Sequence, residues 1–147
     1  MFSSRSKPRF KGGSIDAEPC NPAAARTPAI HFDFSNNHLK VSGESYPEDV
    51  TEFYKPVFSA FDAYLATLGS GSCRFDFELI YINSSSAKAI MMLMDKLDAA
   101  AATNGASIDI YWFYDVEDDT MQELGEEFGE DLESAKFHLE KMKADVS

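Results

Sequence analysis

The stretch RFDFELIYINSSSAKAIMMLMDKL, Arg74 to Leu97, carries the clearest fold signal in the chain. Its first part begins with alternating apolar and polar residues and ends almost wholly apolar, as expected of an inner strand. A helical pattern follows directly, with Ile90, Met94 and Leu97 on one face. Between strand and helix stand an asparagine and three consecutive serines, residues 83–86. This polar junction needs an explanation.

Weaker signals on either side complete a predicted element order of β-β-α-β-α-β-α-β. PAIHFDF and HLKVSG alternate like the two arms of a hairpin around the turn SNN. SIDIYWFYD predicts a fourth strand, the acidic segment after it a helix, and AKFHLEKM a fifth strand. Strands separated by helices pair in parallel through right-handed crossovers. We therefore expect an α/β fold in a single domain, with a small mixed sheet of about five strands.

A helix is predicted between the hairpin and Arg74, with an apolar face that runs from Val50 to Leu68. Two start signals compete for it. Ser45 and Glu48 match a capping box, whereas Pro47 suits the first helical position. Pro56 lies inside the pattern and is expected to kink the helix or break it near Lys55.

Acidic side chains indicate where the helices lie. Asp76, Glu78 and Asp109 recur on one face of their predicted strands. Helices on both faces of the sheet would bury these carboxylates at a high cost in free energy. We therefore expect the helices mainly on one face.

The charge of the chain is unevenly distributed. The net charge is −12, yet residues 1–26 carry five basic and two acidic side chains. The Ser, Pro, Gly, Lys and Arg content of this segment predicts a disordered basic tail, followed by one domain over residues 27–147. The acidic body repels nucleic acid and anionic membranes. No apolar run reaches the roughly 20 residues that span a bilayer, and no secretory signal is recognisable, so we expect a cytoplasmic protein.

The sequence carries none of the common catalytic motifs: no GxGxxG, P-loop, GxSxG or HExxH. Its cysteines and histidines follow no metal-ligand spacing. We therefore expect no enzymatic activity, no metal and no cofactor. The alternative is a small acidic metal-binding protein or hydrolase that uses the carboxylates of Asp115 to Asp119. That segment lacks the glycine of a calcium loop. It also fits a solvated turn in which Asp118 or Asp119 caps the next helix, or an acidic docking surface for a basic partner.

The polar junction itself has two interpretations. One of Asn83, Ser84 and Ser85 must cap the helix, because its first N–H groups need acceptors. The second interpretation is a phosphorylation site, since free N–H groups and the helix dipole favour a phosphate at this end. Lys88 lies four residues after Ser84 and leans back toward the helix start, where it is placed to pair with the phosphate.

Four blocks of the chain together resemble the SiaC family of bacterial regulatory phosphoproteins. They are TPAIHFDF, GESYPEDVTEFYKPV, YINSSSAKAI and YWFYDVEDDTMQELGEEFGED. The resemblance implies a STAS-like domain, which agrees with the element order above. The family's phosphorylated residue directly follows the asparagine and is usually threonine. It falls on Ser84 here, with Asn83, Ser85, Ser86 and Lys88 as its neighbours.

The resemblance also implies partners and a function. The partners are a Ser/Thr kinase with a histidine-kinase-like ATPase fold, a PP2C-like phosphatase and a diguanylate cyclase. The unphosphorylated form would bind and activate the cyclase in cyclic-di-GMP and biofilm signalling. The same match places Ser45, Tyr46, Pro47 and Glu48 on the partner-binding face.

Overall fold

The computed structural model describes residues 20–21 and 27–142, and in this part the chain forms one six-stranded sheet whose strands lie in chain order. The first three strands pair antiparallel, and the third to the sixth pair in parallel. This confirms the α/β class and the mixed sheet. The elements are β1 (Cys20–Asn21), β2 (Ala29–Asp33), the 3-10 helix η2 (Phe34–Asn36), β3 (His38–Ser45), α1 (Val50–Leu68), β4 (Ser72–Ile82), α2 (Ser84–Asn104), β5 (Ser107–Tyr114), α3 (Asp119–Glu130) and β6 (Lys136–Lys141).

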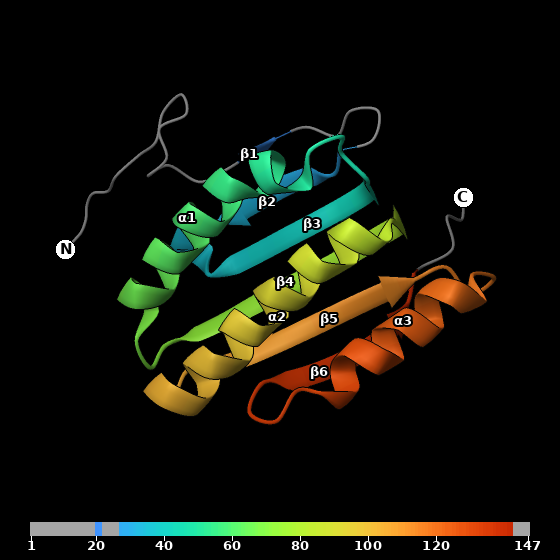
Figure 1. Cartoon of the computed structure of the whole chain (residues 1–147). Coiled ribbons are helices and arrows are strands. Elements are labelled where there is room, and N and C mark those ends of the chain that lie inside the picture. The colour runs from blue at the N-terminus through green and yellow to red at the C-terminus, as the bar shows by residue number, and fades with distance from the viewer. Residues whose placement is uncertain (1–19, 22–26, 143–147) are drawn as a thin grey trace.

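The three α-helices of the described residues cover the same face of the sheet (Figure 1). The apolar core lies between them and the sheet, and β5 alternates buried residues from Ile108 to Tyr114 toward it. None of these helices is long and apolar enough to cross a membrane.

The opposite face of the sheet carries the predicted acidic residues beside arginine and histidine side chains. Asp76 lies 2.8 Å from Arg74 Nε and 2.9 Å from His38 Nε2, and Asp109 lies 3.0 Å from His138 Nε2. The expectation of helices on one face is therefore confirmed, and pairing stabilises the one carboxylate of this set that is almost fully buried, Asp76.

Helix α1 starts later than either predicted signal. Its N-cap is Asp49, whose carboxylate accepts a hydrogen bond from the Glu52 N–H at 3.0 Å. Both predicted starts, the box of Ser45 with Glu48 and Pro47 at the first position, are therefore wrong. Ser45 ends β3 with its hydroxyl bonded inside the domain, and Pro47 is buried ahead of the helix.

Pro56 was predicted to kink α1 or to break it near Lys55; the helix is continuous through Pro56, so the break is wrong. Proline leaves the carbonyl of the residue four positions earlier without a helical donor. Here Glu52 and Pro56 both lie on the exposed side of α1, so that carbonyl faces solvent and is not left in the core.

Helix α3 approaches the sheet closely because glycines face the strands. A Cβ on Gly125 would lie 2.4 Å from Trp112 Cδ1, and one on Gly129 would lie 2.5 Å from Phe137 Cδ2. The close contact lets Trp112 Nε1 donate to the Met121 carbonyl at 3.0 Å. These contacts fix the β5–α3 loop and with it the acidic segment.

Strand β1 lies on the tail side of the predicted boundary between tail and domain. β1 pairs Cys20 with His31 and Asn21 with Ile30, so strand pairing starts inside the segment assigned to the tail. Residues 1–19 and 22–26 lie outside the described part. The division at residue 26 stays a prediction.

Candidate functional site: the polar start of helix α2

The register of two parallel strands brings both predicted site segments together. β3 and β4 end at the same edge of the sheet, where Ser45 is the register partner of Ile82. The Asn83 N–H then donates to the Ser45 carbonyl at 3.2 Å. The SYPE segment and the serine segment are therefore neighbours.

Asn83 is the residue that caps α2. Its Oδ1 accepts a hydrogen bond from the Ser86 N–H at 2.8 Å, and its backbone is extended, as an N-cap requires. This decides among the three candidates that the sequence left open. Ser84 and Ser85 are not used as caps, and both are exposed.

Ser86 is part of a buried chain of hydroxyl groups. Ser45 Oγ donates to Ser86 Oγ at 2.9 Å and lies 2.7 Å from the hydroxyl of Tyr54. Because Ser45 has one hydroxyl proton, Tyr54 is the donor in the shorter bond. Burial raises the pKa of Tyr54 to about 12, although its bond with Ser45 opposes the rise, so this hydroxyl keeps its proton at neutral pH.

This chain ties the end of β3, the first turns of α1 and the start of α2 to one another. Ser45 and Ser86 are fully buried, and Tyr54 is almost so. Three buried hydroxyls are tolerated because each has a partner. Ser86 is thus a structural residue, and a kinase has no access to it in the folded domain.

The exposed side of the first turns carries Ser84 and Lys88. Residues of a helix advance by about 100° each, so positions four apart lie on one side. Lys88 is exposed, and no described residue forms a hydrogen bond or ion pair with it. The pair lies opposite the buried Ile90 and Leu93.

The N–H groups at this helix start are divided between used and unused donors. The Ser86 N–H goes to the Asn83 side chain and the Ala87 N–H to the Asn83 carbonyl, at 2.8 and 2.9 Å. Within the described residues, the N–H groups of Ser84 and Ser85 have no acceptor. They remain available to an anion carried by the same turn.

The four predicted partner-contact residues divide by burial. Ser45 and Pro47 are buried in the domain, so they support this surface from within and do not present side chains to a partner. Tyr46 is half-buried and Glu48 is exposed. The ring of Tyr46 meets the ring of Tyr81 edge-on, with centroids 5.0 Å apart.

Tyr81 is a surface residue that sequence reasoning missed. Tyr81 is 48% exposed although it lies on an inner strand. Its neighbour Tyr46 is distant in sequence, and only the β3–β4 register places the two rings together. No local pattern in the strand marks it.

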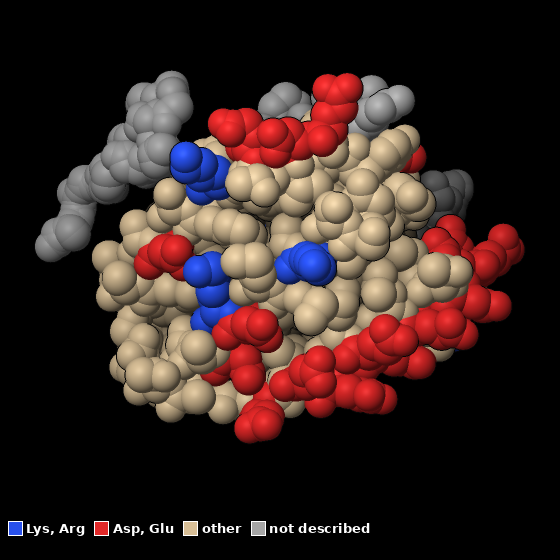
Figure 2. Space-filling model, viewed as in Figure 1, with Lys and Arg blue, Asp and Glu red and all other residues tan. Residues whose placement is uncertain are grey.

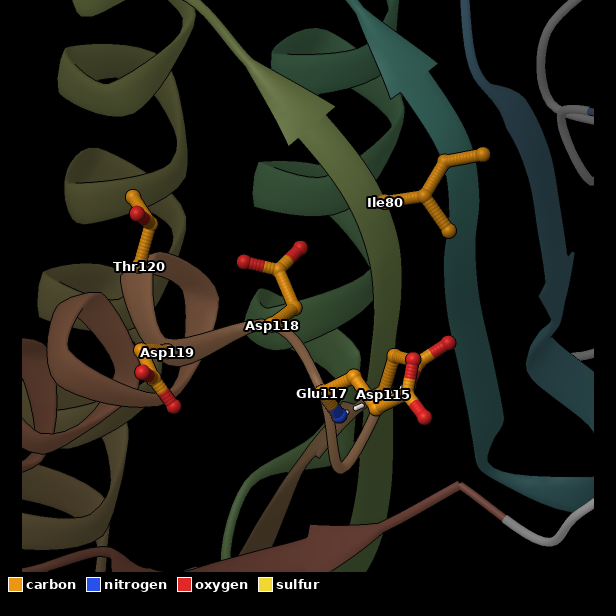
Figure 3. Close-up of a pocket in the computed structure, with 6 residues that line it drawn as sticks. All are labelled: Ile80, Asp115, Glu117, Asp118, Asp119 and Thr120. Atoms are coloured by element: carbon orange, nitrogen blue, oxygen red, sulfur yellow. Dashed lines mark hydrogen bonds between the residues drawn. The ribbon is translucent and has the colours of Figure 1, made fainter.

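The acidic segment after β5 is used for local structure. Asp118 caps α3 by accepting from the Met121 N–H at 3.0 Å, and Asp115 accepts from the Glu117 N–H at 2.9 Å. Figure 3 shows a pocket lined by Ile80 and residues of this segment, in which the carboxylates of Asp115, Asp118 and Asp119 point in different directions.

No three His, Cys, Asp or Glu side chains of residues 20–21 and 27–142 are grouped so that they could hold a metal ion. The geometry therefore gives no support to the metal-binding or hydrolase alternative.

The protein is a small α/β domain with exposed hydroxyls at a capped helix start. These features agree with the class that the sequence suggested, a regulatory phosphoprotein. The sequence model of the SiaC family of regulatory phosphoproteins matches residues 21–142. The chain belongs to this family.

Relatives from Pseudomonas aeruginosa support this assignment. An uncharacterized protein of strain UCBPP-PA14 is 36% identical over 110 residues, which cover 75% of this chain and 86% of the relative. The crystal structure of apo-SiaC is similar with a TM-score of 0.76 at 33% identity, covering 84% of this chain and 98% of that one. A SiaC chain solved in complex with the diguanylate cyclase SiaD, which it is described as activating, has a TM-score of 0.76 at 34% identity, covering 82% and 97%.

Proposed function

We propose that this chain is a non-enzymatic cytoplasmic switch protein. A Ser/Thr kinase phosphorylates it on Ser84, and the unphosphorylated form binds and activates a diguanylate cyclase. The observation that carries the proposal is that the polar residues at the start of α2 have different structural roles. Asn83 caps the helix and Ser86 is buried, which leaves Ser84 exposed directly after the asparagine.

The local geometry favours a phosphate on Ser84. The unused N–H groups of Ser84 and Ser85 and the positive end of the helix dipole attract an anion. Lys88 lies one turn further on the same side and lacks a partner among the described residues. Its ammonium group is free to form a charge-assisted bond with the phosphate.

The phosphate acts by changing the charge of a binding surface. It adds about −1.5 to −2 charge at pH 7. Since the Ser84 hydroxyl forms no hydrogen bond with the described residues, this change requires no rearrangement of the fold. The proposed surface includes Tyr46 and Glu48, which directly follow Ser45 in the chain, and the Ser45 carbonyl accepts a hydrogen bond from the Asn83 N–H.

The proposed partners complete a phosphorylation circuit. A kinase with a histidine-kinase-like ATPase fold adds the phosphate and a PP2C-like phosphatase removes it. The output is cyclic-di-GMP signalling and biofilm formation. The SiaC relative solved with SiaD, at 34% identity, is described as an activator of that cyclase, which supports a cyclase as the binding partner here.

The test is to map the phosphate. Purified protein is incubated with the cognate kinase and ATP, and the modified residue is identified by mass spectrometry. Ser85→Ala is the matched control, because it removes the neighbouring exposed hydroxyl. We expect phosphate on Ser84, no modification of Ser84→Ala and normal modification of Ser85→Ala. Phosphate on Ser85 or Ser86, with Ser84→Ala modified at the normal rate, would refute the assignment.

A further inference from the structure

Strand β6 forms one exposed edge of the sheet. It pairs with β5 over its whole length without a bulge, and no described strand pairs with its other side. Its sequence, KFHLEK, contains neither proline nor glycine. A regular edge of this kind presents unpaired N–H and C=O groups to any strand that is added to it. The outer side of β6 can therefore accept one more strand.

The direction of the backbone groups in β6 follows from a hydrogen bond at its end. The Met142 N–H donates to the Tyr114 carbonyl of β5 at 2.8 Å. The backbone groups of successive residues in a strand point to alternate sides, so the even-numbered residues of β6 bond to β5. The odd-numbered residues Phe137, Leu139 and Lys141 therefore direct their N–H and C=O groups outward.

Helix α3 places negative charge along this edge. A Cβ on Gly125 would lie 2.9 Å from Leu139 Cδ1, and one on Gly129 would lie 2.5 Å from Phe137 Cδ2, so α3 lies directly over β6. Figure 2 shows acidic side chains in a band along α3, and residues 115–133 include no Lys or Arg. The exposed acids of the helix are Asp119, Glu123, Glu126, Glu127 and Glu130. A strand added to β6 meets these carboxylates on its helix side.

One segment of the chain has the complementary charge pattern. Residues 5–11 read RSKPRFK, in which every second residue is a cation: Arg5, Lys7, Arg9 and Lys11. Alternate residues of a strand lie on one face, so this segment presents all four cations on the same side when it is extended. The segment lies outside the described residues, and it precedes the part of the chain that the SiaC family model matches.

We propose that residues 5–11 of a second copy of this chain add to β6 as an antiparallel strand. Residues directly opposite each other in an antiparallel pair lie on the same face of the sheet. The cations of the segment then stand opposite Phe137 and Leu139, with their side chains toward α3. Glu126 and Glu130 are exposed and directly follow the two glycines that face β6. Strand addition to a sheet edge is a common mode of peptide recognition.

The position of Pro8 selects the antiparallel direction. In the antiparallel pair the odd-numbered residues of the segment bond to β6, so Pro8 faces away and its missing N–H costs nothing. A parallel strand with its cations toward α3 would bond through the even-numbered residues and would need the Pro8 N–H. Lys141, which ends β6 on the helix side, favours registers that keep the cations near Phe137 and Leu139. On the open face, the uncharged residues of the segment lie against Lys136, His138 and Glu140.

Chain length favours the segment of a second copy over the chain's own segment. Strand β1 lies at the opposite edge of the sheet and begins at Cys20, which is nine residues after Lys11. Nine residues span at most about 32 Å. A strand beyond β6 lies six strand spacings from β1, about 29 Å. The path must also clear the side chains on one face of the sheet, so the chain's own segment reaches β6 only when fully stretched.

Sedimentation velocity of the full-length chain, from micromolar to millimolar concentration, tests the proposal. The decisive variant exchanges neighbours within the segment and is Ser6→Lys, Lys7→Ser, Arg9→Phe and Phe10→Arg. It keeps the composition and the net charge, but it moves two cations to the other face of the strand. The matched control exchanges two cations, Arg5→Lys with Lys7→Arg, and keeps the alternation.

We expect the wild type and the control to associate alike, with an affinity that falls as salt is added. The exchange variant should associate about tenfold more weakly or less. A chain that stays monomeric over the whole range would overturn the proposal, and so would equal association of the exchange variant, since the attraction would then depend on charge alone. Neither a kinase nor a cyclase enters this test, so its outcome is independent of the proposed function.

Amide hydrogen exchange followed by NMR identifies the strand that is bound. In the associated wild type, exchange of the Phe137, Leu139 and Lys141 amides should slow by about tenfold or more relative to the dilute protein. The amides of His138 and Glu140 point to β5 and should change little. If the three outward amides exchange equally fast in the two samples, the segment does not bind β6 and the inference is wrong.

Discussion

Replacing Asn83 with alanine separates the structural role of the α2 start from its chemical role. The Asn83 side chain accepts the Ser86 N–H at 2.8 Å, and Ser86 in turn accepts from Ser45 in the buried hydroxyl chain. Loss of an N-cap costs about 0.5–2 kcal/mol. Because the first turn of α2 also positions Ser86 for the buried bond, we expect a value in the upper half of that range. The melting temperature should fall by about 2–8 °C per kcal/mol for a domain of this size.

Ser84→Ala is the matched control one residue away. The Ser84 side chain is exposed and its hydroxyl forms no hydrogen bond with the described residues, so its replacement should change the free energy of unfolding by less than about 0.5 kcal/mol. Urea titrations followed by circular dichroism measure both variants. Asn83→Ala should still accept phosphate, whereas Ser84→Ala should not. If Ser84→Ala loses as much stability as Asn83→Ala, then Ser84 is a cap and the assignment of roles at this junction is wrong.

Three further predictions concern the rest of the domain. Gly125→Ala should destabilise it by about 1–3 kcal/mol, because the new Cβ would lie 2.4 Å from Trp112 Cδ1; an unchanged melting temperature would contradict the close helix–sheet contact. Burial raises the pKa of Asp98, but N–H bonds from residues 133–135 outweigh it and hold that pKa below the usual 3.8. The wild type should therefore exceed Asp98→Asn in free energy of unfolding by its full amount above about pH 5, and this difference should shrink as the pH falls through the lowered pKa. Urea titrations of both proteins at pH 7 and pH 3 measure the difference, and a constant difference would contradict the prediction. Deletion of residues 1–26 removes only the two-residue pairing of β1 from the described sheet, so the melting temperature should shift by at most a few degrees; a drop of about ten degrees would mean that the tail stabilises the core.

Local periodicity was sufficient to predict the order of strands and helices from β2 onward, whereas β1 lies in the segment predicted to be a disordered tail. The apolar face from Val50 to Leu68 is the buried face of α1, and the faces of α2 and α3 follow the same rule. The side of the sheet that the helices occupy followed from the burial cost of Asp76, Glu78 and Asp109. These inferences succeed because they depend on spacing and hydration along one segment.

The start of α1 shows where local reasoning fails. Ser45 matches a capping box in sequence, but its hydroxyl is bonded to Tyr54 and Ser86, which lie 9 and 41 residues away. A capping rule considers only the nearest residues and cannot anticipate such partners. Asp49, four residues later, is then left as the free acceptor for the first turn.

The same limit applies to the site. Asn83, Ser84 and Ser85 are all residue types that cap helices well, so their identities alone cannot rank them. The burial of Ser86 and the contact between Tyr46 and Tyr81 both depend on the β3–β4 register. The position of Ser84 was predicted through its family resemblance, whereas its exposure is a property of the folded helix.

The most direct test of the switch compares one preparation of protein in two states. Half of the purified chain is phosphorylated on Ser84 to completion, and both halves are titrated against the cognate diguanylate cyclase while cyclase activity is followed. We predict that the unphosphorylated chain binds and raises the activity, and that phosphate weakens binding by about tenfold or more. Equal affinity in the two states, or tighter binding by the phosphorylated chain, would contradict the account.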